Sequence, residues 1–147
     1  MALSRKSKYG LKALLTLAEE EGQGPVLVSA LAKREAIPKK FLEAILLELK
    51  RAGLVQSRRG QHGGYLLRRK PSDITFADVI RVLDGPLTGV PCIGDPASVG
   101  CDECVDETTC AVRLVMNEAY DATARILDQA TLASVHRRLS RKHRKLS

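Results

Sequence analysis

The sequence is poor in aromatic residues: among 147 residues it has no tryptophan, three tyrosines and two phenylalanines. Proteins that read single-stranded RNA stack the bases on aromatic side chains, and five aromatics are too few for such a platform. The sequence also lacks an apolar run near the ~18 residues that span a bilayer. No signal-type apolar stretch follows the N-terminal residues MALSRKSK. We therefore expect a cytoplasmic protein with no membrane partner.

Cysteine is absent from the 128 positions outside residues 92–110. Inside this window the spacing C-x8-C-x2-C-x5-C places Cys92, Cys101, Cys104 and Cys110. A secreted protein held together by disulfides would spread its cysteines through the fold. The cluster indicates one local site instead.

Acidic residues are scarce in the first half of the chain. Residues 1–70 contain 15 Lys and Arg but six Asp and Glu, residues 71–135 contain three and 11, and residues 136–147 contain six and none. A basic N-terminal half is typical of a protein that binds a polyanion such as DNA, although a solvated surface has the same composition. The basic residues do not follow one face of a single helix, which argues against binding to a membrane surface.

Apolar spacing predicts three helices in the first third of the chain. Residues 4–21 and residues 38–52 place apolar side chains at i, i+3, i+4 and i+7. A short helix is expected between them, with Ser29 as its N-cap. Two short helices joined by a tight turn predict a helix-turn-helix, in which Lys39 and Lys40 open the helix that enters the DNA major groove.

The stretch RRGQHGGYLLRR, residues 58–69, puts three glycines between pairs of arginines. Strands are expected at 54–57 and 65–67, and the glycines supply the backbone angles of the turn between them. A phosphate-binding loop is excluded because no Lys-Ser or Lys-Thr follows the glycines and no helix begins there. A hairpin directly after a helix-turn-helix predicts a winged helix. Its thin tip approaches DNA, and its arginines contact phosphates or a narrow minor groove.

The C-terminal half is predicted to be an effector loop and a long helix. A helix over 75–84, capped near Ser72 or Asp73, completes a winged-helix DNA-binding domain over residues 1–85. Residues 86–107 are expected to form the cysteine-bearing loop, and residues 108–135 a dimerisation helix. That helix carries an apolar seam, which suits either a partner helix or the chain's own first helix: Val112, Val115, Met116, Ala119, Thr123, Ile126, Leu127 and Ala130. Residues 136–147 are expected to form a frayed basic tail.

Three chemistries remain open for the cysteines. A structural zinc site favours paired C-x2-C knuckles or Cys/His pairs, yet only Cys101 and Cys104 form such a pair and the window contains no histidine. An iron–sulfur cluster tolerates looser spacing, with four thiols or three thiols and an oxygen ligand, and is favoured over zinc or thiol redox. A thiol oxidoreductase is least favoured, because no βαβ pattern surrounds the pair and no histidine lies nearby to activate a thiolate.

Several segments together resemble the Rrf-type winged-helix transcriptional regulators, the family of IscR, NsrR and CymR. The matching segments are SKYGLKALLTLA (7–18), IPKKFLEAIL (37–46), AGLVQSRRGQHGGYLL (52–67), ITFADVIRVLDGPL (74–87), and the cysteine loop with its long helix. The wing string is the most specific of them, and the resemblance covers nearly the full length. It implies a homodimeric repressor that binds a double-stranded DNA operator and is not an enzyme.

The resemblance also implies a ligand set for a [2Fe–2S] or [4Fe–4S] cluster. Cluster-binding members use three cysteines, which Cys92, Cys104 and Cys110 match, and Cys101 is then an extra, possible fourth ligand. Some relatives take an oxygen ligand from an acidic residue in the first helix of the partner subunit. This chain has Lys8 there, which argues against that arrangement. A regulator of the same fold switched by zinc or by thiol oxidation, with no cluster, is the alternative.

The recognition helix departs from the family at residues 41–44, which read FLEA where Tyr-Leu-Glu-Gln is common. Glu43 is retained and accepts a hydrogen bond from a cytosine amine in this interpretation, whereas Ala44 lacks the amide that reads adenine. The operator sequence therefore does not follow from the resemblance. The predicted DNA-contacting residues are Ser29, Lys39, Lys40, Glu43, Arg58, Arg59, Gly60 and His62.

Overall fold

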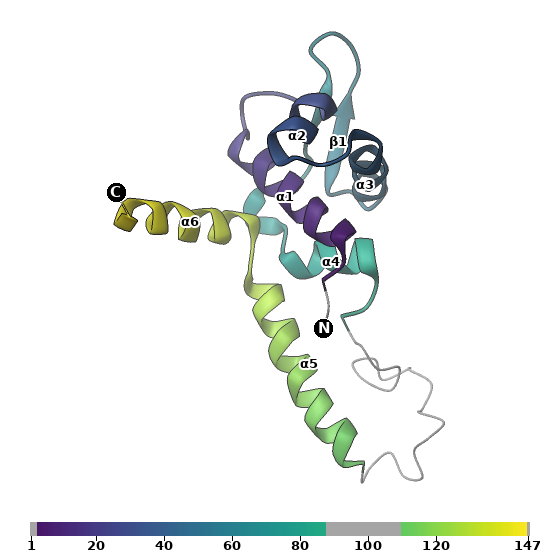
Figure 1. Ribbon diagram of the computed structural model, residues 1–147, viewed down its shortest axis with the longest axis vertical. Helices are drawn as coiled ribbons and strands as arrows, with labels where there is room; N and C mark the ends of the chain where they lie inside the picture. The colour runs from purple at the N-terminus through teal and green to yellow at the C-terminus, as the bar shows by residue number, and fades with distance from the viewer. Residues whose placement is uncertain (1–2, 88–109, 147) are drawn as a thin grey trace.

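The computed structural model describes residues 3–87 and 110–146, and Figure 1 shows a helical domain from which two further helices extend. The predicted fold class is confirmed, since helices dominate and the two strands form one antiparallel hairpin. Within these ranges no helix is both long and apolar enough to cross a bilayer. The elements are α1 (Arg5–Glu19), α2 (Val28–Glu35), α3 (Lys39–Arg51), β1 (Val55–Arg58), β2 (Gly64–Leu67), the 3-10 helix η1 (Pro71–Asp73), α4 (Phe76–Asp84), α5 (Ala111–Gln129) and α6 (Leu132–Leu146).

The core lies where α1, α3 and α4 pack against one another. Each of these helices turns an apolar stripe inward, and a fully buried Leu or Ile side chain stabilises the fold by about 1.5–3 kcal/mol. The stripe predicted in α3 is confirmed, because all four of its residues have no exposed surface: Leu42, Ile45, Leu46 and Leu49. This burial fixes which face of α3 is left for a partner.

The turn between α2 and α3 is held by a left-handed residue. Ala36 has φ 54° and ψ 48°, and the Ile37 amide donates to the Ala32 carbonyl at 2.9 Å. This is the hydrogen-bond pattern of a Schellman helix end, with the apolar residue after it buried. The predicted N-cap of α2 is wrong: Leu27 occupies that position, and Ser29 lies inside the helix. Ser29 is the second residue of the helix, so its own amide is one of the orphan donors that a capping side chain would have to accept from.

The wing is an antiparallel hairpin in which Val55 pairs with Leu67 and Arg58 with Gly64. Its strands lie within one residue of the predicted ones. A third segment joins the hairpin, since Val26 and Tyr65 exchange two backbone hydrogen bonds of 2.9 Å each. The wing is therefore anchored to the chain that enters α2.

Helix α4 begins with a capping box that the sequence interpretation placed too early. Thr75, rather than Ser72 or Asp73, is the N-cap, and Asp78 returns the second hydrogen bond of the box. Residues 71–73 form η1 instead. At its other end α4 contacts α5 through Arg81, whose guanidinium donates to both carboxylate oxygens of Asp128 at 2.8 and 3.3 Å.

The long C-terminal helix predicted over 108–135 is interrupted. Ala130 and Thr131 lie beside the start of α4, where the Phe76 amide donates to the Ala130 carbonyl at 2.8 Å. Thr131 and Ser134 then form a second reciprocal cap, which starts α6. The predicted frayed tail is wrong over this stretch, because α6 continues to Leu146. Its cations favour helix because they lie at the negative end of the helix dipole.

The start of α1 is held by the last residue of α4. Asp84 accepts hydrogen bonds from the hydroxyls of Ser4 at 2.5 Å and Ser7 at 2.6 Å, and Ser7 is fully buried. Partial burial raises the pKa of Asp84, but the hydrogen bonds from Ser4 and Ser7 outweigh it, so this pKa lies below its ordinary value. A depressed carboxylate pKa stabilises the fold above the unfolded-state pKa, and that contribution is lost as the pH falls through the folded-state pKa.

We therefore expect Asp84→Asn to lower the free energy of unfolding by about 1 kcal/mol near neutral pH, a small value because the carboxylate is largely solvated. The difference from the unmodified protein should shrink as the pH falls from the ordinary aspartate pKa of about 3.9 through the lower folded-state pKa, since both proteins then carry a neutral group at this position. Urea unfolding followed by circular dichroism across this range measures it. Asp73→Asn, at an exposed carboxylate of η1, is the control, and an equal pH response in both variants would contradict the assignment.

Candidate nucleic-acid interface

The outward face of α3 lies opposite its core face. Lys39 and Phe41 are exposed at the edges of this helix, and at 100° per residue the six exposed side chains between them cover an arc of about 120°. They are Lys40, Glu43, Ala44, Leu47, Lys50 and Arg51. Sequence reasoning found only the first members of this set; continuing the i+3 and i+4 spacing from Glu43 and Ala44 would have added Leu47, Lys50 and Arg51. The helix thus offers one carboxylate and two apolar groups, flanked by cations.

Some basic residues of the domain are paired, whereas four at the start of α3 and at the wing are not. Lys6 contacts Glu48 at 2.6 Å, and Arg81 contacts Asp128 at 2.8 Å. Among residues 3–87 and 110–146, no carboxylate lies within ion-pair distance of Lys39, Lys40, Arg58 or Arg59, which are all exposed. Cations without an internal counter-charge give this side of the domain its attraction for polyanions.

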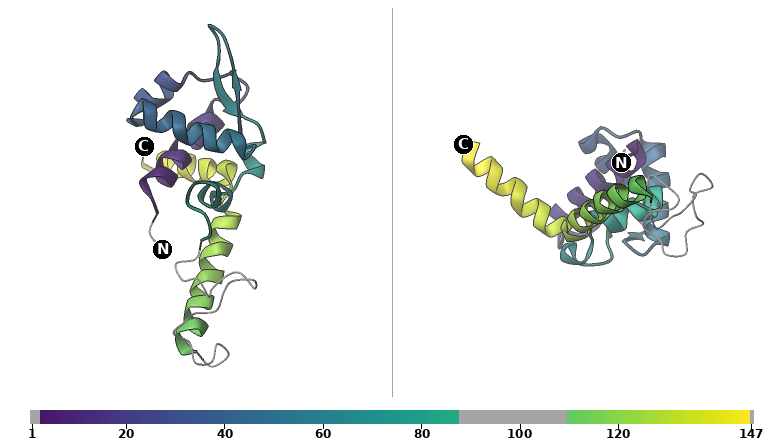
Figure 2. Two further views of the ribbon diagram at one scale, coloured as in Figure 1. Left: turned by 90° about the vertical axis from the view of Figure 1, so that its right-hand side faces the viewer. Right: turned by 90° about the horizontal axis from the view of Figure 1, so that it is seen from below.

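The wing is attached to α3 as well as to the chain before α2. Strand β1 packs against α3, and the Lys50 ammonium donates to the Ser57 hydroxyl at 2.8 Å. Figure 2 shows the hairpin beside α3, extending beyond the helices. Its tip requires glycine, since Gly60 has φ 106° with no atom within 4 Å of an added Cβ. The recognition helix and the arginine-bearing strands therefore present one continuous surface.

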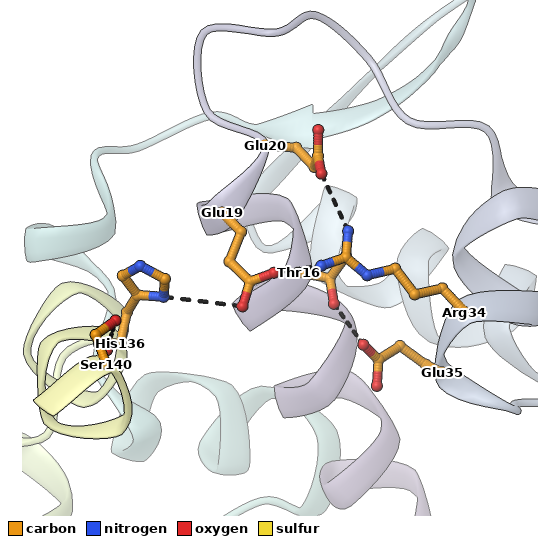
Figure 3. A network of polar contacts seen from close by, with 7 residues as sticks. All are labelled: Thr16, Glu19, Glu20, Arg34, Glu35, His136 and Ser140. Carbon is orange, nitrogen blue, oxygen red and sulfur yellow. Dashed lines mark hydrogen bonds and ion pairs between the residues drawn. The ribbon is translucent and has the colours of Figure 1, made fainter. Parts of the chain in front are cut away.

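A polar network fixes α2, the first helix of the pair, against α1 (Figure 3). Arg34 pairs with Glu19 and, at 3.0 Å, with Glu20, and the Thr16 hydroxyl donates to Glu35 at 2.6 Å. The hydrogen bond to Glu20 is the main reason why the pKa of Arg34 lies above its ordinary value. His136 of α6 lies 3.8 Å from Glu19 at the edge of the same network. These contacts make α2 a rigid support for the turn and for α3.

The predicted DNA-contacting residues are all exposed and lie in two groups along the chain. Ser29 is exposed in the first turn of α2, and Lys39, Lys40 and Glu43 are exposed on α3. The others are exposed at or next to the hairpin tip: Arg58, Arg59, Gly60 and His62. The basic residues of α6 do not extend this surface, because Figures 1 and 2 show α6 projecting from the side of the domain away from α3.

The predicted cysteine site lies almost entirely outside the described residues. This applies to Cys92, Cys101 and Cys104, whereas Cys110 is the N-cap residue of α5. Over the described ranges, no three His, Cys, Asp or Glu side chains come together in a way that could hold a metal ion. What the structure does place is the two ends of the cysteine segment: Leu87 is buried in the core, and Cys110 opens α5.

Helix α5 has one apolar face on its own domain and one that faces outward. Tyr120, Ala124 and Leu127 pack against the core, and α4 rather than α1 is the main partner of α5 within the chain. Leu127 is thus the one large apolar residue of the predicted seam that packs on the core, while three others are largely exposed: Val112 by 68%, Val115 by 61% and Ile126 by 66%. A stripe of this kind on a soluble helix is typical of an interaction site.

Comparison with known proteins shows which family has this fold. The model of the Rrf2 family, described as an iron-dependent transcriptional regulator, matches residues 3–138. An rrf2-like HTH-type transcriptional regulator of Rhodobacter capsulatus is 40% identical over 133 residues, which cover 88% of this chain and 89% of the relative.

Two solved structures have the same architecture. The structure of CymR, the global cysteine regulator of B. subtilis, superposes with a TM-score of 0.77 at 34% identity and covers 92% of this chain and 96% of its own. IscR of T. potens superposes with a TM-score of 0.74 at 33% identity and covers 95% and 88%. These relatives are transcriptional regulators and not enzymes, as the sequence predicted for this chain.

Proposed function

We propose, from the premise that this chain belongs to the Rrf2 family of transcriptional regulators, that it is a homodimeric repressor whose affinity for operator DNA is switched at the cysteines of residues 92–110. The observation that carries the DNA-binding part is the continuous exposed surface of α3 and the wing, with its unpaired cations. Lys39 and Lys40 start the recognition helix, and Arg58 and Arg59 edge the hairpin. A cytoplasmic location follows from this function.

In the proposed complex α3 lies in the major groove and the wing follows the sugar–phosphate backbone. Glu43 projects from the second turn of α3, where a side chain reaches base edges, and a carboxylate accepts a hydrogen bond from the cytosine amine. The four cations and Ser29 bind phosphates and set the register of the protein on the duplex. His62 and Gly60 lie at the tip, where only a narrow hairpin approaches the minor groove closely.

The homodimer is proposed from α5. Its outward stripe of Val112, Val115 and Ile126 exposes contiguous apolar surface, and such surfaces are usually covered by a partner. Two copies related by a two-fold axis bury the same stripe against itself and present two recognition helices to two half-sites. The described part of the chain offers no comparable apolar stripe on the side of α3.

We assign the switch to an iron–sulfur cluster held by Cys92, Cys104 and Cys110, with Cys101 as a possible fourth ligand. Cys110 at the N-cap of a 19-residue helix fits this role, because the helix dipole and the first-turn amides favour a thiolate there. When bound, the cluster supplies a redox-sensitive link among these thiolates. Zinc or reversible thiol oxidation in the same cysteines is the second candidate, and a structure of an oxidized form exists for CymR of Staphylococcus aureus, which is 30% identical to this chain.

The contacts of α4 connect the helices that flank the cysteine segment with the recognition helix. The segment begins after α4 and ends at α5, and Arg81 and Asp128 connect these two helices. Helix α4 packs against both α1 and α3, and Asp84 holds the first turn of α1. A change in how residues 88–109 tie α4 to α5 therefore alters the angle between α5 and the recognition helix, and in a dimer it alters the spacing of the two recognition helices.

The test combines a spectrum with a binding titration. Protein purified without oxygen should be brown, with visible absorbance and bound iron and sulfide, and removing the chromophore should change its affinity for an operator duplex at least tenfold. Two copies of the four cations make about eight phosphate contacts, so affinity should fall roughly ten-thousandfold between 50 and 200 mM salt. Fluorescence anisotropy with duplexes enriched from a random library measures both effects.

Different results separate the parts of the proposal. Colourless protein with stoichiometric zinc, or with no metal and an oxidation-dependent affinity, selects the second candidate for the switch. Failure to bind duplex DNA in a salt-dependent way, in any state of the cysteines, contradicts the proposed function as a whole.

A further inference from the structure

Leu47 lies at the centre of the outward face of α3, so a partner that binds this face would cover it. It is 42% exposed. At 100° per residue it lies about 60° from Ala44 and 40° from Glu43, and it faces away from the buried stripe of Leu42, Ile45, Leu46 and Leu49. A core role therefore does not explain it. Its neighbours on either side are cations, Lys40 and Arg51.

The other exposed large apolar residue of α3, Phe41, has a partner within the chain. Phe41 packs edge-on against Tyr9 of α1, with ring centroids 5.6 Å apart and planes at 76°. It lies about 120° around the helix from Leu47, toward α1. Leu47 and Ala44 thus form the apolar part of the reading face, and the rise between them is about 4.5 Å, which lies between one and two steps of about 3.4 Å along the duplex.

The chemistry of such a face selects one kind of base edge. In the major groove, purines present acceptor atoms that need donors, whereas thymine presents a C5-methyl group that needs an apolar contact. On α3, Glu43 offers an acceptor, and Ala44 and Leu47 offer apolar groups. Donors on this face lie about one turn outside this apolar pair: Lys40 four residues before Ala44, and Arg51 four residues after Leu47. Resting on the proposed function, we infer that Ala44 and Leu47 read thymine methyl groups and that the half-site carries a cytosine beside one or two thymines on the strand that faces them.

Replacing thymine by uracil in the DNA tests this without altering the protein, because it removes the methyl group and leaves base pairing intact. Duplexes are first enriched from a random library with the full-length protein. Each thymine of the enriched half-site is then replaced by uracil in turn, and affinity is measured by fluorescence anisotropy at fixed salt. We expect one or two positions at which affinity falls about fourfold per methyl, and smaller changes elsewhere.

Leu47→Ala completes a double-mutant cycle. Since Leu47 is exposed, the variant should fold, which circular dichroism checks, and it should bind the thymine duplex several-fold more weakly. On the duplex with uracil at the sensitive position its effect should largely disappear, because the contact is already lost. Leu139→Ala, at a leucine of α6 that is 47% exposed, is the matched control and should leave the uracil effect unchanged.

Three results decide between the possibilities. A methyl-sensitive position whose effect vanishes in Leu47→Ala supports the inference. Enriched duplexes that bind equally well with uracil at every position overturn it while leaving DNA binding intact, and so does a uracil effect that Leu47→Ala does not reduce. If no duplex is enriched above background, the proposed DNA-binding function fails and the inference fails with it.

Discussion

Replacing Gly64 by alanine is expected to lower the free energy of unfolding by about 2–4 kcal/mol and to weaken DNA binding by at least tenfold. A methyl group at this position would lie 2.2 Å from the Val26 carbonyl oxygen and 2.8 Å from the Leu27 amide nitrogen, and the glycine has φ +141°. The clash is with backbone, so no side chain can rotate to relieve it. The chain must open the Val26–Tyr65 bridge that anchors the wing.

Gly22→Ala is the matched control for this prediction. Gly22 also has a positive φ of +85°, but nothing lies within 4 Å of an added Cβ. This variant bears only the conformational cost, about 1 kcal/mol, and should bind DNA like the unmodified protein. Chemical denaturation and anisotropy titration of both variants give the comparison. Equal stability losses in the two proteins, with DNA affinity retained in both, would mean that the wing does not depend on its contact with Val26.

The sequence predicted the helix-turn-helix and wing well because local signals there agree with tertiary packing. The apolar spacing of α3 is also its burial pattern, and the glycines of the wing occupy positions where larger residues would clash or open the turn. The caps were less predictable. Ser29 and Ser72 are good capping residues, but α2 starts just after the Val26–Tyr65 bridge, which depends on the wing. Helix α4 starts at Thr75, whose box with Asp78 is a local signal that the sequence interpretation missed.

The C-terminal region shows why a periodic pattern can mislead about continuity. The apolar seam from Val112 to Ala130 keeps its helical spacing to the end, although helix α5 stops at Gln129. The helix ends there because the Ala130 carbonyl accepts a hydrogen bond from the Phe76 amide of α4 instead of from a residue further along the chain. The basic composition of the C-terminal segment predicted a solvated, irregular tail. The segment is instead the helix α6, because Thr131 and Ser134 cap its start and Leu132 is buried in the core. Contacts between residues far apart in the chain cannot be predicted from the periodicity of a short sequence segment.

Among the described helices, α5 provides the most direct test of assembly. Ile126→Glu is expected to convert the proposed dimer to a monomer, with a dissociation constant raised at least a thousandfold. The two-fold arrangement places the change twice in one interface, so two carboxylates would have to be buried near each other without partners. DNA affinity should fall about a hundredfold or more, since two half-sites can no longer be bound by one particle. Analytical ultracentrifugation and anisotropy titration measure these effects.

Leu114→Glu separates loss of the seam from a general effect of charge on α5. Leu114 is 64% exposed, like Ile126 at 66%, but it lies about 140° around the helix from the centre of the seam. The control should therefore remain dimeric and keep its affinity for DNA. The outward stripe would lose its assigned role if Ile126→Glu stayed dimeric, and a monomer that still bound full operators tightly would contradict the coupling of assembly to DNA recognition. Because Leu127 and Ala124 hold the opposite face of α5 on α4, the monomer should keep its secondary structure, so that a change in assembly is not mistaken for unfolding.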